Sequence, residues 1–192
     1  MVDTTRKTLL QRVRDNTDHA AWEQFFALYA PLLEAYARAM GLSRNDAEEV
    51  RDECLALITR RMPSFEYERA KGSFQAWLYR LARGKVVDHL RRPSTQRAST
   101  ETLFSIEDSG NALDERWETL WRREHLRHAF SVARRGEDAT TVAVFELLMI
   151  EGLPVADVVA RTGLGARQVY KVKARMLKRV RDVLRSLGVE AP

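Results

Sequence analysis

The apolar residues of this chain recur at helical intervals along most of its length, and this spacing is the feature that most constrains its fold. Between Trp22 and Tyr36 they fall three, four or seven positions apart, and comparable patterns occupy residues 43–62, 74–92 and 114–187. No stretch shows a convincing alternation of apolar and polar residues, which would predict a half-buried strand. The sequence therefore predicts an all-α protein.

A break in the helical pattern divides the chain into two parts. Pro93 is expected to end the helix before it, because proline lacks a backbone N–H and its ring clashes with the preceding turn. The residues that follow, 93–113, are rich in serine and threonine and show no helical period. We therefore predict two small helical domains, at residues 1–92 and 114–192, joined by a flexible linker at residues 93–113.

Local signals place the helices of the N-terminal domain. Ser43 is a suitable cap for a helix with acidic residues in its first turn, and Pro63 should end that helix. The following helix is expected to run from about Phe74 to Arg92. Pro31 lies inside the first helical pattern, where it should either start a new helix or kink the existing one.

The composition narrows the class of protein. Hydrophobic residues make up 45 % of the chain, enough to build a core, and 32 basic against 27 acidic residues give a net charge of +5. Cys54 is the one cysteine, which predicts neither a disulfide nor a zinc cluster. The N-terminus lacks the apolar stretch of a signal peptide, and no apolar run is long enough to span a bilayer. We expect a cytoplasmic protein without a metal, a cofactor or a membrane segment.

No set of residues in the sequence has the pattern of a catalytic site. We find no Ser/His/Asp set, glycine-rich phosphate loop or pair of carboxylates that would support one. Of the histidines, His19 and His89 have no evident partner. We therefore expect that the protein is not an enzyme and has no catalytic residues.

The segment from residue 151 to residue 185 has the pattern of a helix-turn-helix. Pro154 suits the first turn of a helix, and Gly163 can adopt the left-handed conformation that ends it. The next helix should bury residues at helical spacing: Val169, Val172, Met176 and Val180. In a helix-turn-helix, this second helix enters the major groove of DNA.

The charge of that second helix supports DNA binding. Between Ala166 and Arg185 there are eight basic residues and one acidic residue, Asp182, for a net charge of +7. A helix of this charge can neutralise several phosphates. The alternative for this segment alone is an ordinary amphipathic helix with a solvated basic face.

Two neighbouring helices of the N-terminal domain carry opposite charge. Five acidic residues lie between positions 46 and 53, and Asp46, Glu49 and Glu53 form one stripe beside the apolar face. These like charges repel one another, so an acidic helix in a DNA-binding protein predicts a basic protein partner. The next helix and its preceding loop combine basic and aromatic residues, which can follow a phosphate backbone and hold unstacked bases.

Taken in order, these three motifs resemble the extracytoplasmic-function group of the sigma-70 family. The segment 46–53 looks like the acidic motif of region 2.2, which in that family docks on the clamp of the largest polymerase subunit. The segment 72–92 looks like regions 2.3 and 2.4, which melt and read the −10 element. The helix-turn-helix looks like region 4, which reads the −35 element. The resemblance covers roughly residues 20–187, including the lack of a region 3 domain.

The resemblance implies an RNA polymerase sigma factor, which binds core polymerase and directs promoter-specific initiation. Its implied partners are core polymerase and promoter DNA, and the sequence leaves open whether an anti-sigma factor also binds it. The core-binding residues that it implies are Asp46, Glu49, Asp52 and Glu53. The residues that it implies for the −10 element are Phe65, Lys71, Phe74, Arg80, Arg83 and Lys85. For the −35 element they are Arg167, Gln168, Tyr170, Lys171, Arg175 and Lys178.

The position of each −35 residue along the second helix of the motif suggests whether it contacts a base or a phosphate. The N-terminal part of a recognition helix reaches base edges, so Arg167 and Gln168 are expected to make bidentate base contacts. Arg175 and Lys178 lie further along and are expected to hold phosphates, whereas Lys171 suits either role.

Gly84 departs from the family pattern, because the family usually has an asparagine there that helps to hold a −10 base. Reading of the −10 element is therefore expected to depend on the loop at residues 65–74 or to be less stringent. The main alternative to a sigma factor is a stand-alone helix-turn-helix regulator with an N-terminal dimerisation or sensing domain. Such a regulator would bind duplex DNA tightly on its own, whereas a sigma factor should bind it weakly until core polymerase is added.

Overall fold

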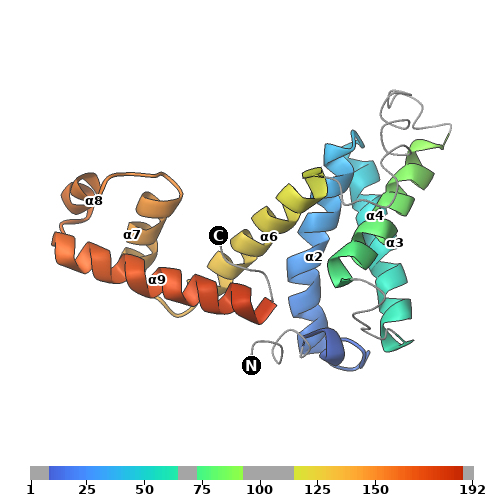
Figure 1. Ribbon diagram of the computed structural model, residues 1–192, viewed down its shortest axis with the longest axis horizontal. Coiled ribbons are helices and arrows are strands. Elements are labelled where there is room, and N and C mark those ends of the chain that lie inside the picture. The colour runs from blue at the N-terminus through green and yellow to red at the C-terminus, as the bar shows by residue number, and fades with distance from the viewer. Residues whose placement is uncertain (1–8, 65–72, 93–114, 188–192) are drawn as a thin grey trace. The chain divides into compact units, whose positions relative to one another are not determined.

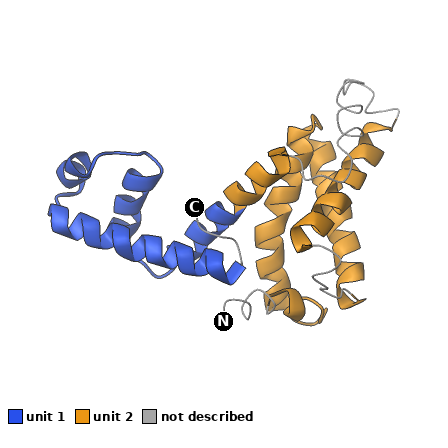
Figure 2. Ribbon diagram, in the orientation of Figure 1, with its two compact units in different colours: residues 1–5, 125–192 blue, residues 6–124 orange. Residues whose placement is uncertain are grey.

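The computed structural model describes residues 9–64, 73–92 and 115–187, and the regular elements in these ranges are all helices (Figure 1). The predicted all-α fold class is confirmed. The chain divides between Glu124 and His125 into an N-terminal and a C-terminal compact unit (Figure 2). None of the helices in the described ranges is both long and apolar enough to cross a membrane.

Capping side chains set where the helices of the N-terminal unit begin. This unit holds α2 (His19–Ala39), α3 (Arg44–Arg61), the short 3-10 helix η1 (Met62–Ser64), α4 (Phe74–Leu90) and the first turns of α6 (Glu115–Ala133). The hydroxyl oxygens of Ser43 and Ser73 accept hydrogen bonds of 3.2 Å from backbone N–H groups in the first turns of α3 and α4. As predicted, Ser43 caps α3, and this helix ends before Pro63.

Pro31 does not begin a new helix. The helix α2 continues through it as one element of 21 residues. Proline removes one helical hydrogen bond, but Leu28, Leu32 and Leu33 on either side of it are buried in the core. Their tertiary packing holds the segment helical where the local signal alone suggested a break.

Aromatic rings fill the core between α2 and α4. Tyr29 lies 4.5 Å from Phe25 and 5.3 Å from Phe74 between ring centroids, and Tyr36 lies 5.9 Å from Tyr79. The pairs are tilted or edge-to-face, which are favourable arrangements for aromatic rings. Phe74 and Tyr79 are therefore part of the hydrophobic core of the unit.

The start of α6 completes this aromatic core. Trp117 is fully buried, with its ring centroid 5.2 Å from that of Tyr36 and 5.6 Å from that of Tyr79. Trp121 lies 5.8 Å from Tyr29. The sequence placed the start of the second domain at residue 114, but through these contacts the first turns of α6 pack with the N-terminal unit. The predicted linker at residues 93–113 lies outside the described residues.

The C-terminal unit contains the adjacent short helices that the sequence predicted. It holds the rest of α6 together with α7 (Ala139–Met149), α8 (Val155–Thr162) and α9 (Ala166–Leu187). The helix α8 follows Pro154 and ends at Gly163, whose φ of 70° is left-handed. Val169, Met176 and Val180 of α9 are buried against α6, α7 and α8, and Val172 is partly buried beside them. These are the four residues predicted to face inward.

Replacing Trp117 by alanine should strongly destabilise the N-terminal unit. Truncation of a buried tryptophan removes its packing and leaves a cavity, which costs about 3 to 5 kcal/mol in the free energy of unfolding. Leu126→Ala is a matched control, because Leu126 is on the same helix but exposed. It should cost well under about 1 kcal/mol. Urea unfolding followed by circular dichroism measures both, and a similar small loss for the two variants would contradict the packing of Trp117.

Candidate functional site

The acidic stripe of α3 faces a row of basic and histidine side chains on α4. We call Asp46, Glu49, Glu53, Lys85, His89 and Arg92 together the charge ladder. The three acidic residues occupy one face of α3 at helical spacing, Lys85 and His89 occupy one face of α4, and Arg92 lies two residues beyond the end of α4. The two rows are in direct contact, so the acidic stripe is already paired within the protein.

Arg92 is the central cation of the ladder, because it bridges two carboxylates. Its Nη1 atom lies 2.7 Å from Oε1 of Glu49, and its Nη2 atom lies 2.9 Å from Oε1 of Glu53. The second oxygen of Glu53, Oε2, lies 2.9 Å from Nζ of Lys85. Both oxygens of Glu53 are thus occupied by cations from α4.

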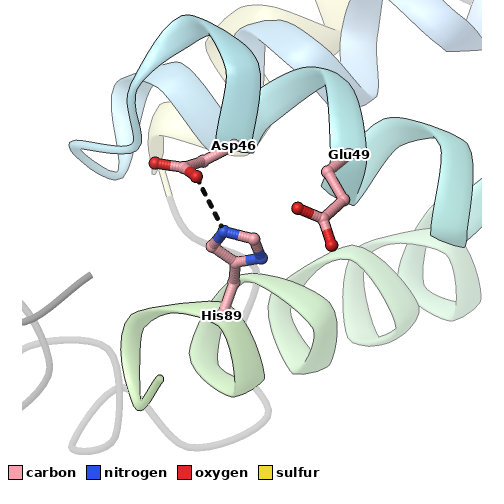
Figure 3. Close-up of side chains that lie close together, drawn as sticks. All are labelled: Asp46, Glu49 and His89. Atoms are coloured by element: carbon pink, nitrogen blue, oxygen red, sulfur yellow. Dashed lines mark ion pairs between the residues drawn. The ribbon is translucent and has the colours of Figure 1, made fainter. Parts of the chain in front are cut away.

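His89 forms the buried end of the ladder (Figure 3). Its side chain is only 3 % exposed, and its Nε2 atom lies 3.1 Å from Oδ1 of Asp46. No partner for His89 was evident from the sequence, and the structure shows that its partner is Asp46. The signal that could have found it is its position four residues after Lys85 and three before Arg92, on the same face of the helix.

Hydrogen bonds and ion pairs stabilise the charged forms of two ladder carboxylates. The Ser43 hydroxyl, which donates to Asp46 at 2.6 Å, and then His89 hold the pKa of Asp46 below its usual value. The pKa of Glu53 is also lowered, chiefly by the hydrogen bond from Lys85; burial opposes this shift, and the hydrogen bond from Arg92 adds to it. Both groups therefore favour the folded state when they are ionised.

The other acidic residues of the segment 46–53 are paired as well. Asp52 accepts a 2.8 Å bond from Arg51, which also reaches Glu34 on α2 at 2.8 Å. Glu48 pairs with Arg44 one turn away at 2.9 Å. A partner that binds this face of α3 would therefore meet carboxylates that already carry intramolecular cations.

Three of the ladder residues lie close enough together to suggest a metal site. Asp46, Glu49 and His89 each offer a ligand atom, and these atoms lie within 4.8 Å of one another (Figure 3). Glu49, however, is held by the guanidinium of Arg92, and Asp46 by Ser43 and His89. A cation would have to displace Arg92 to reach these ligands, so we assign no metal to the cluster.

The −10 residues suggested by the resemblance do not form one surface. Phe74 is buried against Phe25 and Tyr29, and the ammonium of Lys85 points to Glu53 rather than outward. Arg83 is half-buried, whereas Arg80 is exposed. Phe65 and Lys71 lie outside the described residues. Of this set, Arg80 is thus the one that the described structure presents to solvent.

Gly84 lies on the same exposed face of α4 as Arg80. A Cβ atom added at Gly84 would meet no other atom within 4 Å. Asp88 and Arg91 continue this face toward the end of the helix. The helix α4 thus has one side turned to the acidic stripe and another turned to solvent, with Gly84 in the middle of the solvent side.

The −35 residues suggested by the resemblance are all exposed on α9. Their side chains differ in how they are held. The Oε1 atom of Gln168 accepts a 3.0 Å hydrogen bond from the backbone N–H of Gly165, so it caps the start of the helix. In a bidentate contact to adenine, the Oε1 atom of Gln168 would have to accept a second hydrogen bond or give up the one from Gly165.

Arg175 is held by residues at the start of α7. Its Nη2 atom lies 2.8 Å from Oε2 of Glu137 and 3.0 Å from the hydroxyl oxygen of Thr141. Arg179 also contacts Glu137 and donates to the backbone carbonyl of Arg135 at 3.0 Å. These contacts tie α9 to the turn before α7, which leaves Arg175 less available for a phosphate than predicted.

The remaining exposed residues of α9 offer contacts of different chemistry. Tyr170 is 58 % exposed, unusual for a large aromatic side chain, and lies on the helix close to Arg167 and Lys171. Within residues 115–187, Arg167, Lys171 and Lys178 form no ion pair. Their charges are therefore available to an anionic partner.

Comparison with known proteins relates these surfaces to one family. A family model described as Sigma-70 region 2 matches residues 25–96, which contain α3, α4 and the complete charge ladder. The chain is also 27 % identical over 168 residues to the ECF RNA polymerase sigma factor RpoE of Cereibacter sphaeroides, an alignment that covers 85 % of this chain and 88 % of that protein. The chain therefore contains a match to Sigma-70 region 2 and is similar over most of its length to an extracytoplasmic-function sigma factor.

Because the pKa of Glu53 is lowered in the folded state, the free energy of unfolding should decrease as the pH falls in the acidic range. The unfolded chain protonates this carboxyl more readily than the folded chain does, so its contribution is complete above the unfolded pKa and is lost as the pH falls through the lower pKa of the folded state. In Glu53→Gln, the free energy of unfolding should fall less steeply between pH 5 and pH 3 than in the wild type. Urea unfolding at a series of pH values measures this slope.

Glu23→Gln is the matched control for that series. Glu23 is exposed on α2 and forms no ion pair within the described residues. Its substitution should leave the acid dependence as it is in the wild type. Identical slopes for the wild type and Glu53→Gln would show that Lys85 and Arg92 do not stabilise the ionised form of Glu53.

Proposed function

We propose that this protein binds RNA polymerase core through the acidic face of α3 and directs initiation at promoters that it reads through α4 and α9. The observation that carries the proposal is that the region 2 match covers the helices bearing the acidic face, while the basic α9 follows in a separate unit. Sigma factors are regulatory initiation factors, and the polymerase supplies the chemistry of transcription. The site of action is where core polymerase is found, in the cytoplasm.

The proposed core interface is centred on the most exposed acidic residues of α3. The side chain of Glu49 is 53 % exposed, and that of Asp52 is more so. Asp46 and Glu53 flank them on the same helix. A basic surface such as the clamp of the largest subunit would complement this face, because opposite charges steer association and fix register.

The proposed DNA surfaces are the solvent side of α4 and the first turns of α9. Arg80 supplies positive charge on α4, and the segment 65–72 carries two further −10 residues of the predicted set, Phe65 and Lys71. On α9, Arg167 can read a guanine and Tyr170 can contact a thymine methyl, while Lys178 holds a phosphate. We assign region 2 functions to residues 1–92, a linker to residues 93–113 and region 4 functions to residues 114–192. An anti-sigma factor, if present, would have to cover one of these surfaces.

Neutralising the acidic face should weaken binding to core polymerase. The double variant Glu49→Gln and Glu53→Gln keeps side-chain size but removes two charges, and we expect a loss of roughly 2 kcal/mol or more in binding free energy. Titration of labelled protein with core polymerase, combined with run-off transcription, measures binding and function together. Glu23→Gln is the control and should match the wild type in both.

Two results would contradict this function. If the folded double variant bound core polymerase as tightly as the wild type, the acidic face would not be the interface. If the wild-type protein bound duplex promoter DNA tightly and core polymerase changed neither binding nor transcription, the protein would instead act as a stand-alone helix-turn-helix regulator.

Substitutions on α9 should separate base reading from phosphate binding. Arg167→Ala should cost on the order of 1 to 3 kcal/mol in the free energy of promoter binding and relax the base preference at one −35 position. Lys178→Ala should weaken binding to all DNA sequences about equally. It should also reduce the slope of log affinity against log salt by roughly one unit. Gln168→Ala should alter selection less than Arg167→Ala does, because its Oε1 atom is engaged by Gly165.

Holoenzyme selection on a randomised −35 library measures these effects. Wild-type and variant holoenzymes are compared at two salt concentrations on the same library. If Arg167→Ala left the selected sequence unchanged, base reading would not occur on this face of α9.

A further inference from the structure

The charge ladder uses the same residues that two different partners would need. In the free protein, the carboxylates of Glu49 and Glu53 are engaged by Arg92 and Lys85. While they are held this way, the carboxylates are only partly available to a basic protein surface, and the cations are only partly available to DNA phosphates. With His89 neutral, three carboxylates and two cations leave the ladder a net charge of −1, against −3 for the bare acidic stripe.

We propose that the charge ladder is an exchange device: cations of core polymerase replace Arg92 and Lys85 on the acidic stripe, and the released side chains then bind promoter phosphates. This inference rests on the proposed function, because it requires that the acidic face of α3 is the core-binding surface. It adds Arg92 and Lys85 as residues that link the binding of core polymerase to the binding of DNA.

The two ends of the ladder differ in how readily they can exchange. His89 is buried and holds Asp46 at the interior end. The Arg92 side chain is 41 % exposed, and its partner Glu49 is more exposed still. Ion pairs in water at a protein surface are weak, because solvent competes for both members. The Arg92 end can therefore open while His89 and Asp46 keep α3 and α4 together.

The geometry of Arg92 explains why the exchange should be close to all-or-none. A guanidinium forms its strongest anion contacts in a bidentate manner, and both terminal nitrogens of Arg92 are used by Glu49 and Glu53. Arg92 cannot present this same pair of N–H groups to a phosphate until it leaves both carboxylates. It also directly follows Arg91, on the exposed side of α4, so a released Arg92 would extend the positive charge at the end of that helix.

Thermodynamic linkage predicts that removing the acidic residues of the ladder and removing Arg92 have opposite effects on DNA binding. If core polymerase and DNA each bind the open form, then each favours the binding of the other by the same factor. Removing the acidic partners should release Arg92 and strengthen DNA binding by the free protein. Removing Arg92 should unmask the acidic stripe and strengthen binding to core polymerase, at the expense of DNA binding by the holoenzyme.

The experiment compares full-length wild-type protein with Arg92→Gln, with Glu49→Gln plus Glu53→Gln, and with the control Arg14→Gln. Arg14 is exposed and outside the ladder. Fluorescence anisotropy measures two quantities over a range of salt: the affinity for core polymerase and the affinity for a forked DNA duplex, with and without core. Circular dichroism and thermal melting establish that each variant folds.

We expect the double glutamine variant to bind the forked duplex about fivefold more tightly than the wild type in the absence of core. The slope of log affinity against log salt should steepen by roughly one to two units, one for each released cation. Arg92→Gln should bind core polymerase a few-fold more tightly, by about threefold or more. Its holoenzyme should bind DNA with a slope that is shallower by about one unit.

Several outcomes would overturn the exchange. Weaker core binding by Arg92→Gln would show that Arg92 supports the acidic surface rather than masks it. Unchanged DNA affinity in the double glutamine variant would show that no cation is released. If Arg92→Gln fails to fold, Arg92→Lys takes its place, since an ammonium bridges two carboxylates less well and should shift both affinities in the same directions. Failure of the wild type and Arg14→Gln to bind core at all would instead reject the proposed function.

Discussion

The packing of aromatic rings between α2, α4 and the start of α6 determines which way α4 faces. Phe74 and Tyr79 are drawn into the core by Tyr29, Tyr36 and Trp117, and this fixes the rotation of the helix. One side of α4 is then turned toward α3 and the opposite side toward solvent. The charged surfaces of the N-terminal unit follow from this apolar constraint, because a rotation of α4 by one residue position would remove Lys85, His89 and Arg92 from the acidic stripe.

Some basic residues of this protein form ion pairs within the fold, whereas others are exposed to solvent, and their contacts distinguish the two groups. In the C-terminal unit, Arg175 and Arg179 converge on Glu137 and hold α9 in place, whereas Arg167 and Lys171 remain at the surface. In the N-terminal unit, Arg92 and Lys85 are engaged and Arg80 is exposed. The count of positive charges on a helix therefore overstates how many can neutralise phosphates at once.

The features predicted correctly from sequence are those that depend on neighbouring residues in the chain. Ser43 caps α3 and Gly163 ends α8 because each acts on its own turn, and the inward face of α9 follows from helical period alone. The features that sequence did not reveal depend on contacts between distant segments. Trp117 packs on Tyr36, and His89 meets Asp46, across long separations in the chain; for His89, the one local signal is the helix face that it shares with Lys85. Arg92 was placed at the end of a helix, but nothing in its surroundings along the chain indicated that it bridges two carboxylates.

Gly84 has a consequence for how this protein can change over evolutionary time. It occupies the middle of an exposed helical face, and a Cβ atom added there meets no other atom within 4 Å, so replacement by alanine would disturb no neighbour. Glycine is also among the poorest residues in a helix, so most replacements would strengthen α4. Mutations that alter what a protein recognises commonly cost stability, and the path to a new specificity is then limited by folding. If α4 reads the −10 element through its solvent side, as proposed, that obstacle is absent at Gly84, and promoter preference can diverge there between descendants of this protein.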